Sequence, residues 1–598
     1  MKKVIKKSLL LQIILLLFII VSCSSEQQTV KSVIDNIVTR FYETMDETEL
    51  FALDNQKILS LISEKEKEIL STKYWTFDVN VPVILSIMHH VDQQAIHRPF
   101  WLTEENGFVK TGMIVKNEHY TYEVWQKSFG AGCVELGING FDKHRPVYFV
   151  SIAAQKKEEK LQLSNFYPEN QYISVMDVGA FTYHDWDELV LLEVPEELKG
   201  QKLLTTIRGR AREAHLIHAF RKTPFPSSPK PDQVMLTWSE NPQFTQTIQW
   251  RTSIDVNDGV VVYAEKISET SQNFKEVKAL CQILEDRLLQ NDRYIHRFTA
   301  VLENLKPATT YVCRVGSHMK NKWSQDAEFI TSPDSSAPFT FVYFGDTHKS
   351  PHWGKLINTA FERHPETAFY TIAGDLVSTG LYRDDWDQLF EYSADVIKHR
   401  ALMPCLGNHD DQDGLGAWMY NELFALPQNG PFEKERESTY SFNYSNALFM
   451  ILDVTSSYES QVDWIEEQLS TTNATWKFAV FHFPPYMYDS EYQDIRDLWG
   501  TVFDKYHLDM AFSGHVHYYA RSKPIYDQKP VNSPAEGTIY VTSIAIPSGD
   551  EEQPEEKYTE VHFGGGMLYQ ILKIESNRLE YSVYNLEGDV RDKFVIIK

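Results

Sequence analysis

The chain has 598 residues, a formal net charge of −25 at pH 7, and apolar and charged fractions of 42% and 24% that are ordinary for globular protein. This length is too great for one hydrophobic core and, at about 150 residues per domain, predicts three or four domains. The acidic balance, with no long Lys/Arg cluster beyond the N-terminus, argues against a nucleic-acid duplex as a partner.

The N-terminus has the pattern of an export signal. Four lysines within the first seven residues precede a mostly apolar run over residues 9–21, and Cys23 follows. A basic start followed by a short apolar run is typical of a secretory signal peptide. The sequence around Cys23 resembles the lipobox of bacterial lipoproteins, which implies a signal peptide over residues 1–23 and a lipid anchor through Cys23. A plain signal peptide and a short membrane anchor are the alternatives.

This resemblance also predicts where the protein resides. It implies the cell envelope, with the chain anchored to a bacterial membrane (the outer membrane or a periplasm-facing surface), and it leaves the leaflet open. No later segment approaches 18 apolar residues without charges, so the domains themselves are expected in water. Export permits disulfides, and Cys281 and Cys313 either pair or remain buried thiols.

Residues 24–72 are predicted to form a polar tether and a helical segment. Residues 24–29 are polar, and from there apolar residues recur at the helical period. The positions of the first helix are Val30, Val33, Ile34, Ile37, Val38 and Phe41. A second helix is expected over residues 55–70.

From residue 73 the pattern changes to short β segments, for example residues 81–88, 147–152 and 189–194. Long helical patterns are absent, so residues 73–222 are predicted to be a β-rich, sandwich-like domain. Its role is open. A glycan or a protein is a conceivable partner, and ordinary packing explains its aromatic residues equally well.

A proline-rich linker over residues 223–231 precedes a second β region. Strands are expected at residues 234–238, 247–252 and 259–263. The segment that leads to Tyr311 resembles a tyrosine corner, in which a hydroxyl ties a crossover between sheets to the backbone. Residues 230–332 therefore resemble a fibronectin type III-like sandwich.

Residues 336–598 alternate strands with helices and are predicted to be an α/β domain. Near-continuous apolar runs, typical of strands buried on both faces, occur at residues 340–344, 369–373, 402–406, 448–452, 477–481 and 509–513. Helical patterns lie between them, at residues 386–399 and 461–469 among others.

Five polar motifs directly follow five of these strands. They are Gly345-Asp346-Thr347-His348, Gly374-Asp375, Gly407-Asn408-His409-Asp410, His482 alone, and Gly514-His515-Val516-His517. Together they offer seven oxygen and nitrogen ligands. Open α/β sheets bind ligands beyond the carboxyl ends of their strands, so the motifs are expected to meet. Such a set predicts two adjacent metal ions and displacement at phosphorus.

The ordered set resembles the motifs of calcineurin-like metallophosphoesterases, and with the preceding sandwich the architecture is similar to that of purple acid phosphatases. The resemblance implies a fold of the four-layer β-sandwich metallophosphatase type over residues 336–598. It implies that Asp346, His348 and His517 hold the first metal ion, that Asn408, His482 and His515 hold the second, and that Asp375 bridges both.

The resemblance further implies that His409 lies over the substrate as general acid or oxyanion donor, with Asp410 orienting its ring. A water bound to the ions would be the nucleophile. Purple acid phosphatases have Tyr three residues after the bridging Asp, and here Ser378 takes that place. We therefore expect no purple charge-transfer band. The ligand set suits two ions of Mn, Fe, Zn or Co alike.

The sequence thus predicts an exported, lipid-anchored phosphoesterase that hydrolyses small phosphate monoesters. Two alternatives stay open: a phosphodiesterase acting on nucleotides or lipid head groups, and a non-catalytic surface scaffold with a degenerate catalytic domain. The natural substrate, the metal and the oligomeric state are not encoded in recognisable motifs.

Overall fold

The computed structural model describes residues 28–91, 98–143, 148–168, 171–184, 187–206, 210–267, 273–334, 337–411, 416–431, 437–486, 492–548 and 556–598. The predicted signal peptide and Cys23 lie outside these residues. The chain divides into two compact units, residues 1–220 and 221–598, and each is described by itself. Among the described residues, no helix combines the length and apolar character needed to cross a bilayer.

The described part of the first unit starts with four helices: α2 (Val30–Thr44), α3 (Glu47–Phe51), α4 (Asn55–Leu61) and α5 (Glu64–Thr72). Helix α2 buries all six apolar positions that the periodicity predicted. The single helix expected over residues 55–70 is wrong. Ser63 separates α4 from α5 because its hydroxyl accepts from Glu66 N while the Glu66 carboxylate accepts from Ser63 N, a capping box that starts a new helix.

The rest of the first unit forms two antiparallel sheets. Their orders are β5-β1-β7 and β8-β11-β6-β2-β4-β3-β10-β9. The elements are β1 (Trp75–Val79), β2 (Val83–His90), β3 (Val109–Asn117), β4 (Thr121–Phe129), β5 (Gly132–Leu136), β6 (Phe149–Ala154), β7 (Leu163–Tyr167), β8 (Gln171–Val175), β9 (Phe181–His184), β10 (Asp187–Glu193), β11 (Lys202–Thr206) and the 3₁₀ helix η1 (Arg210–Ala214).

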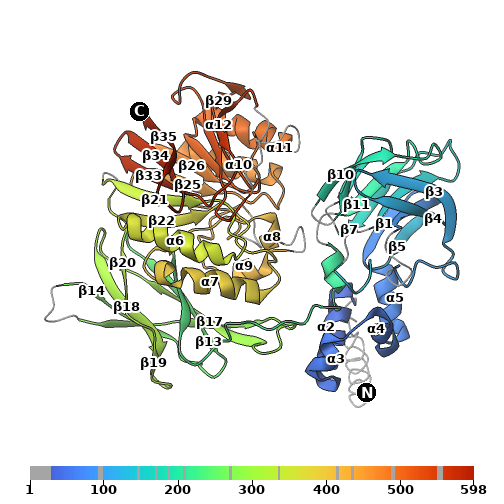
Figure 1. Cartoon of the computed structure of the whole chain (residues 1–598), viewed down its shortest axis with the longest axis horizontal. Helices are drawn as coiled ribbons and strands as arrows, with labels where there is room; N and C mark the ends of the chain where they lie inside the picture. The colour runs from blue at the N-terminus through green and yellow to red at the C-terminus, as the bar shows by residue number, and fades with distance from the viewer. Residues whose placement is uncertain are drawn as a thin grey trace, which may run out of the picture. The chain divides into compact units, whose positions relative to one another are not determined.

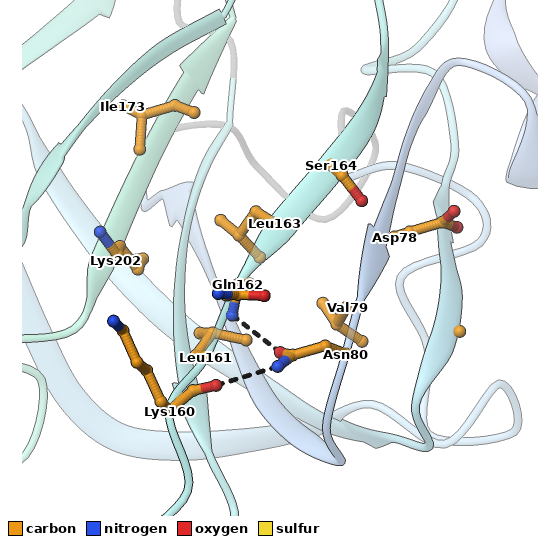
Figure 2. A pocket seen from close by; sticks show the side chains of 11 residues that line it. Asp78, Val79, Asn80, Lys160, Leu161, Gln162, Leu163, Ser164, Ile173 and Lys202 are labelled. Atoms are coloured by element: carbon orange, nitrogen blue, oxygen red, sulfur yellow. Dashed lines mark hydrogen bonds between the residues drawn. The ribbon is translucent and has the colours of Figure 1, made fainter.

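A surface hollow of about 670 Å³ lies beside strands β1, β7, β8 and β11 (Figure 2). The Asn80 side chain bonds to the neighbouring lining segment, donating to Lys160 O (3.0 Å) and accepting from Gln162 N (2.7 Å). Lys160 and Lys202 line it, and no carboxylate pairs with either ammonium among the described residues. None of its lining residues belongs to the predicted metal motifs.

The second unit begins with a β-sandwich, here called the sandwich domain (residues 230–332). Its sheets have the orders β12-β13-β17-β16 and β15-β14-β18-β19, and β20 also pairs with β18. The strands are β12 (Asp232–Thr237), β13 (Gln246–Ser253), β14 (Val260–Glu265), β15 (Lys275–Lys278), β16 (Leu280–Glu285), β17 (Tyr294–Leu302), β18 (Thr310–Ser317), β19 (Lys322–Trp323) and β20 (Ala327–Ile330).

The hydrogen bond predicted for Tyr311 is present, since its hydroxyl accepts from Lys306 N at 2.9 Å. Cys281 and Cys313 are both free thiols, so the pairing alternative does not hold. The description of this domain as fibronectin type III-like stays a prediction.

The remaining described residues form two large mixed sheets with helices around them, and β29 and β30 pair as a separate two-stranded sheet (Figure 1). The orders are β23-β22-β21-β33-β34-β35 and β24-β25-β26-β27-β31-β28-β32. The strands are β21 (Phe339–Phe344), β22 (Thr367–Ile372), β23 (Ala401–Leu402), β24 (Tyr440–Tyr444), β25 (Ala447–Ile451), β26 (Trp476–Val480), β27 (Met510–Ser513), β28 (Tyr519–Ser522), β29 (Ile525–Tyr526), β30 (Lys529–Pro530), β31 (Ile539–Thr542), β32 (Thr559–Phe563), β33 (Tyr569–Glu575), β34 (Arg578–Tyr584) and β35 (Val590–Ile597).

The helices of this domain are α6 (Pro351–Arg363), α7 (Arg383–Ile397), α8 (Asn408–Asp411), α9 (Trp418–Leu423), α10 (Glu459–Thr471), α11 (Gln493–Ile495), the π-helix η2 (Arg496–Gly500) and α12 (Thr501–Tyr506). The strand expected over residues 402–406 is only two residues long. Pro404 has no backbone N–H to give to the ladder, and Cys405 rejoins it as an isolated bridge to Ala373.

Aromatic side chains fill the space between the two sheets. Phe341 of β21 packs on Phe449, Phe478 and Phe512 of the other sheet, with ring centroids 5.0–6.2 Å apart. Strands β21, β22 and β23 run parallel, and so do β25, β26, β27 and β31. Each sheet therefore has one edge at which several carboxyl ends meet, and the buried aromatic layer holds the two sheets together.

Candidate metal centre

The five polar motifs follow the carboxyl ends of strands from both sheets. Asp346 follows β21, Asp375 follows β22 and Asn408 lies beyond β23, whereas His482 follows β26 and His515 follows β27. The first three strands belong to one sheet and the last two to the other. The motifs therefore lie at the carboxyl ends of strands in two different sheets.

The structure brings six of the seven predicted ligands into groups with metal-binding spacing. In each group the ligand atoms lie within 4.8 Å of one another. The groups are Asp346, His348 and His517; His348, Asp375 and His409; and Asp375, His482 and His515. The first equals the set that the resemblance implied for one ion, and the third joins the bridging carboxylate to two ligands of the other.

Asp375 lies between the two sets. Its Oδ2 atom is 3.2 Å from His482 Nε2 and 3.7 Å from His348 Nε2. On the outer side, Asp346 Oδ2 is 3.6 Å from His348 Nε2 and 3.3 Å from His517 Nε2. One carboxylate thus faces imidazoles of both sets, which is the geometry that a bridging ligand needs.

Four of the predicted ligand atoms are buried without a hydrogen-bond partner among the described residues. They are Asp346 Oδ2, His348 Nε2, Asn408 Oδ1 and His482 Nε2. A buried polar atom left unsatisfied costs about 1–3 kcal/mol, so four such atoms in one set of motifs call for a ligand. Imidazole, carboxylate and amide donors are those that divalent transition metals accept, and the residues fit such ions.

Backbone groups fix the orientation of these side chains. His482 Nδ1 lies 2.7 Å from Ala373 O, so this nitrogen carries the proton and Nε2 faces Asp375. The second oxygens of the two carboxylates are also engaged: Asp346 Oδ1 accepts from His515 N at 2.7 Å and Asp375 Oδ1 accepts from His409 N at 2.9 Å. Each carboxylate therefore turns one oxygen to the backbone and the other to the imidazoles.

The electrostatics of the cluster favour charged carboxylates. Burial opposes ionisation, yet the neighbouring imidazoles hold the pKa of both Asp346 and Asp375 below the ordinary range. In return, although burial disfavours the charged ring, Asp375 and Asp346 raise the pKa of His482 to about 9. The site concentrates negative charge that imidazolium or a cation can balance.

Glycines in the motifs leave the space that the ligands occupy. A Cβ on Gly374 would lie 2.5 Å from His482 Nδ1, and one on Gly514 would lie 2.2 Å from Asp346 Oδ1. Gly374 also has a φ of +90°, which side chains disfavour. The Gly-Asp and Gly-His pairs are therefore required by close approach of ligand side chains to the backbone.

The structure corrects the predicted role of Asp410. His409 Nδ1 lies 2.9 Å from Ser378 O, so a backbone carbonyl rather than a carboxylate orients this ring. Asp410 instead accepts from three backbone N–H groups, those of Leu376, Val377 and Gly407, at 2.9–3.2 Å. Its carboxylate holds the loop after Asp375 against the loop before Asn408, and the expectation that it orients His409 is wrong.

His409 lies beside the cluster. Its Nε2 atom is 3.9 Å from Asp375 Oδ2, and its ring centroid is 4.7 Å from that of His348. Burial lowers the pKa of His409 to about 4. Sequence reasoning missed Ser378 O as its partner, since a backbone carbonyl leaves no signature in the sequence. The Ser378 hydroxyl donates to His348 O at 3.2 Å.

Two stretches of the chain match known family models. Residues 231–331 match the purple acid phosphatase N-terminal domain, and residues 339–519 match the calcineurin-like phosphoesterase domain. The chain therefore contains both of these domains. The resemblance inferred from the motifs is confirmed at this level.

Relatives and solved structures agree with the domain matches. The chain is 25% identical over 287 residues to purple acid phosphatase 21 of Arabidopsis thaliana, which covers 44% of this chain and 63% of that protein. It is 25% identical over 412 residues to the Fe(3+)-Zn(2+) purple acid phosphatase 12 of the same plant. This match covers 62% of this chain and 84% of that protein. The fold is similar to that of purple acid phosphatase PPD1 from yellow lupin (Lupinus luteus) seeds, with a TM-score of 0.54 and 18% identity. The match covers 78% of this chain and 82% of the lupin chain.

Proposed function

We propose that the protein is an exported, lipid-anchored phosphoesterase that hydrolyses small phosphate monoesters at a dinuclear metal centre. The observation that carries the proposal is the pair of ligand sets joined at Asp375, with four buried ligand atoms left for ions to satisfy. Asp346, His348 and His517 would hold one ion, and Asn408, His482 and His515 the other. When bound, the ions would acidify a water and neutralise phosphate oxygens.

The protein's own residues would position the metal ligands and supply a proton to the leaving oxygen. His409 donates Nδ1–H to Ser378 O and so turns Nε2 toward the carboxylate cluster. Because burial lowers the pKa of His409 to about 4, Nε2 would hold a proton for the leaving oxygen at acidic pH. The Asp410 carboxylate accepts from three backbone N–H groups of the Asp375 and Asn408 loops and so holds these two loops together. The seven ligands come from five loops on two sheets, which fixes the reacting groups before the substrate arrives.

An assay with paired substrates tests this function and separates it from the diesterase alternative. Purified protein supplied with Mn²⁺ or Zn²⁺ is expected to cleave an aryl phosphate monoester faster than the matching diester. His482→Ala and Asn408→Ala are expected to lower both the metal content, measured by mass spectrometry, and turnover. His507→Ala, a histidine at the end of α12 outside the motifs, is the control. Faster diester cleavage would favour the phosphodiesterase, and no metal with no activity would favour the scaffold.

The lipid anchor is tested separately. Cys23 is the last residue of the predicted signal segment 1–23, and we propose that it carries the lipid. Expression in a bacterium with a labelled fatty acid is expected to label the wild-type chain and leave Cys23→Ser unlabelled. A membrane-bound chain without label would support the short membrane anchor instead, and a chain released from the membrane would support the plain signal peptide.

A further inference from the structure

The turn that carries His348 has an unfavourable backbone conformation. His348 and Lys349 have φ angles of +45° and +53°, both in the left-handed region. For residues other than glycine this region costs about 1–2 kcal/mol each, so two in succession persist only where surrounding contacts determine them. The contacts of this turn therefore decide where the His348 imidazole lies.

Backbone bonds hold the inner side of the turn. His348 N donates to Asp375 O and Lys349 N to Leu376 O, each at 2.9 Å. One side chain holds the outer side, since the Lys349 ammonium pairs with Asp385 Oδ1 on α7. Asp385 is only 1% exposed, whereas Lys349 is 32% exposed, so the carboxylate belongs to the interior of the domain. Removing either partner of a buried pair typically costs several kcal/mol.

The first turn of α7, which carries Asp385, is anchored by the sandwich domain. Arg383 N donates to Asp286 Oδ2 at 3.0 Å, and the Arg383 guanidinium pairs with Asp292 at 2.8 Å. One turn further, Asp387 pairs with Arg251 of β13 at 2.7 Å. Both arginines are fully buried, and their carboxylate partners lie at or below about a tenth exposed. These ion pairs fix the start of α7 relative to the sandwich domain.

We propose that Asp385 is a positioning residue for the first metal site, which links the sandwich domain to ligand His348 through Lys349. This inference rests on the proposed function, because it takes His348 as a ligand. Asn408, His482 and His515 of the second site come from other loops. Helix α7 reaches the Asn408 loop by a separate path, in which Trp386 Nε1 donates to Gly380 O at 2.9 Å and Gly380 N donates to His409 O at 2.8 Å, and Lys349→Met leaves this path intact. The sandwich domain is then a part of the scaffold of the metal centre rather than an appended module.

The proposal predicts a selective loss. Residues that orient metal ligands typically contribute 10–100-fold to metal affinity, so Asp385→Ala is expected to weaken one of the two sites by about that factor. Lys349→Met should do the same and leaves the ion pairs of α7 with the sandwich domain intact. Asp385→Asn, which keeps an acceptor oxygen, should lie between Asp385→Ala and the wild type.

The matched control lies on the same helix. Asp395 pairs with Lys398 at 2.6 Å and is 81% exposed, so Asp395→Ala removes an ion pair of α7 that does not touch the site. Titration of each demetallated protein with Co²⁺, followed by calorimetry and by metal analysis after dialysis, measures the two sites. Wild type and Asp395→Ala should retain about two ions per chain, and Asp385→Ala and Lys349→Met about one.

The outcomes separate this inference from the proposed function. If the wild type binds no metal, the proposed function fails. If the wild type binds two ions and both Asp385→Ala and Lys349→Met bind two with unchanged affinity, the positioning role alone fails. If both sites weaken together in Lys349→Met, the selective link to His348 is overturned. Melting curves of every variant show whether Asp385→Ala folds, and Lys349→Met decides the question if it does not.

Discussion

The carboxylate of Asp410 offers the sharpest test of how the site is built. Its Oδ2 atom accepts from Gly407 N at 2.9 Å and Leu376 N at 3.2 Å, and Oδ1 accepts from Val377 N at 3.1 Å. In Asp410→Asn one oxygen becomes an NH₂ group. The amide can keep the two bonds on one side, but its NH₂ then faces a third N–H group and leaves it without an acceptor.

The expected cost follows from these contacts. One buried N–H without an acceptor costs about 1–3 kcal/mol. This corresponds to a fall of roughly 2–12 °C in the melting temperature of a domain of this size. Because the loops that Asp410 joins carry Asp375 and Asn408, the variant should also retain less metal than the wild type.

Asp453→Asn is the matched control. Asp453 accepts from Thr455 N at 2.8 Å, Thr455 Oγ1 at 2.6 Å and Ser456 Oγ at 3.0 Å in the turn after β25. Its substitution should lower the melting temperature while two metal ions remain bound. Calorimetric melting and metal analysis of both variants make the comparison. An Asp410→Asn protein with wild-type stability and metal content but a lower kcat would refute the reasoning and restore the ring-orienting role.

Three further outcomes are expected. His409→Ala should lower kcat by about 10²–10⁴-fold at unchanged metal content, as loss of a proton donor does, and wild-type kcat would contradict its role. Gly374→Ala places a Cβ 2.5 Å from a ligand imidazole and should lose metal, whereas Gly416→Ala, with φ +100° and open space around it, should not. Burial lowers the pKa of His215 to about 4, so its contribution to stability is complete above pH 6.5 and declines as the pH falls toward 4. Denaturant titration should show a loss of about 2 kcal/mol between pH 7 and 5 that His215→Gln lacks.

Periodicity predicted the elements well where burial alone determines them. Burial alone determines α2, with its six buried apolar positions, and the strands whose aromatic side chains fill the space between the two sheets. The break at Ser63 was missed because a capping box competes locally with an apolar pattern that continues across it. The shortening of β23 was missed because Pro404 acts on the hydrogen-bond ladder and not on hydrophobicity.

In the metal site, too, some residues were predictable from the sequence and others were not. Side chains that act through their own chemistry, such as Asp346 and His482, were predictable because the motif order names them. Ser378 O and Ala373 O, which orient two imidazoles, are backbone atoms and carry no residue preference. Asp385 was invisible for a different reason: it lies in a helix outside the motifs, 36 residues from Lys349 in sequence, and the fold brings the two together.

Three of the predicted metal ligands have a left-handed backbone conformation. His348, Asp375 and His515 have φ angles of +45°, +51° and +72°, and each is a predicted ligand at the end of a strand. Conformations of this kind persist where the surroundings determine them, and here backbone bonds, the Asp410 carboxylate and the Lys349–Asp385 pair do so. The buried ligand atoms without hydrogen-bond partners among the described residues add a second unfavourable contribution at the same loops. The fold therefore holds carboxylates and imidazoles on strained loops at a spacing that a bound cation would make favourable, as a preorganised metal centre requires.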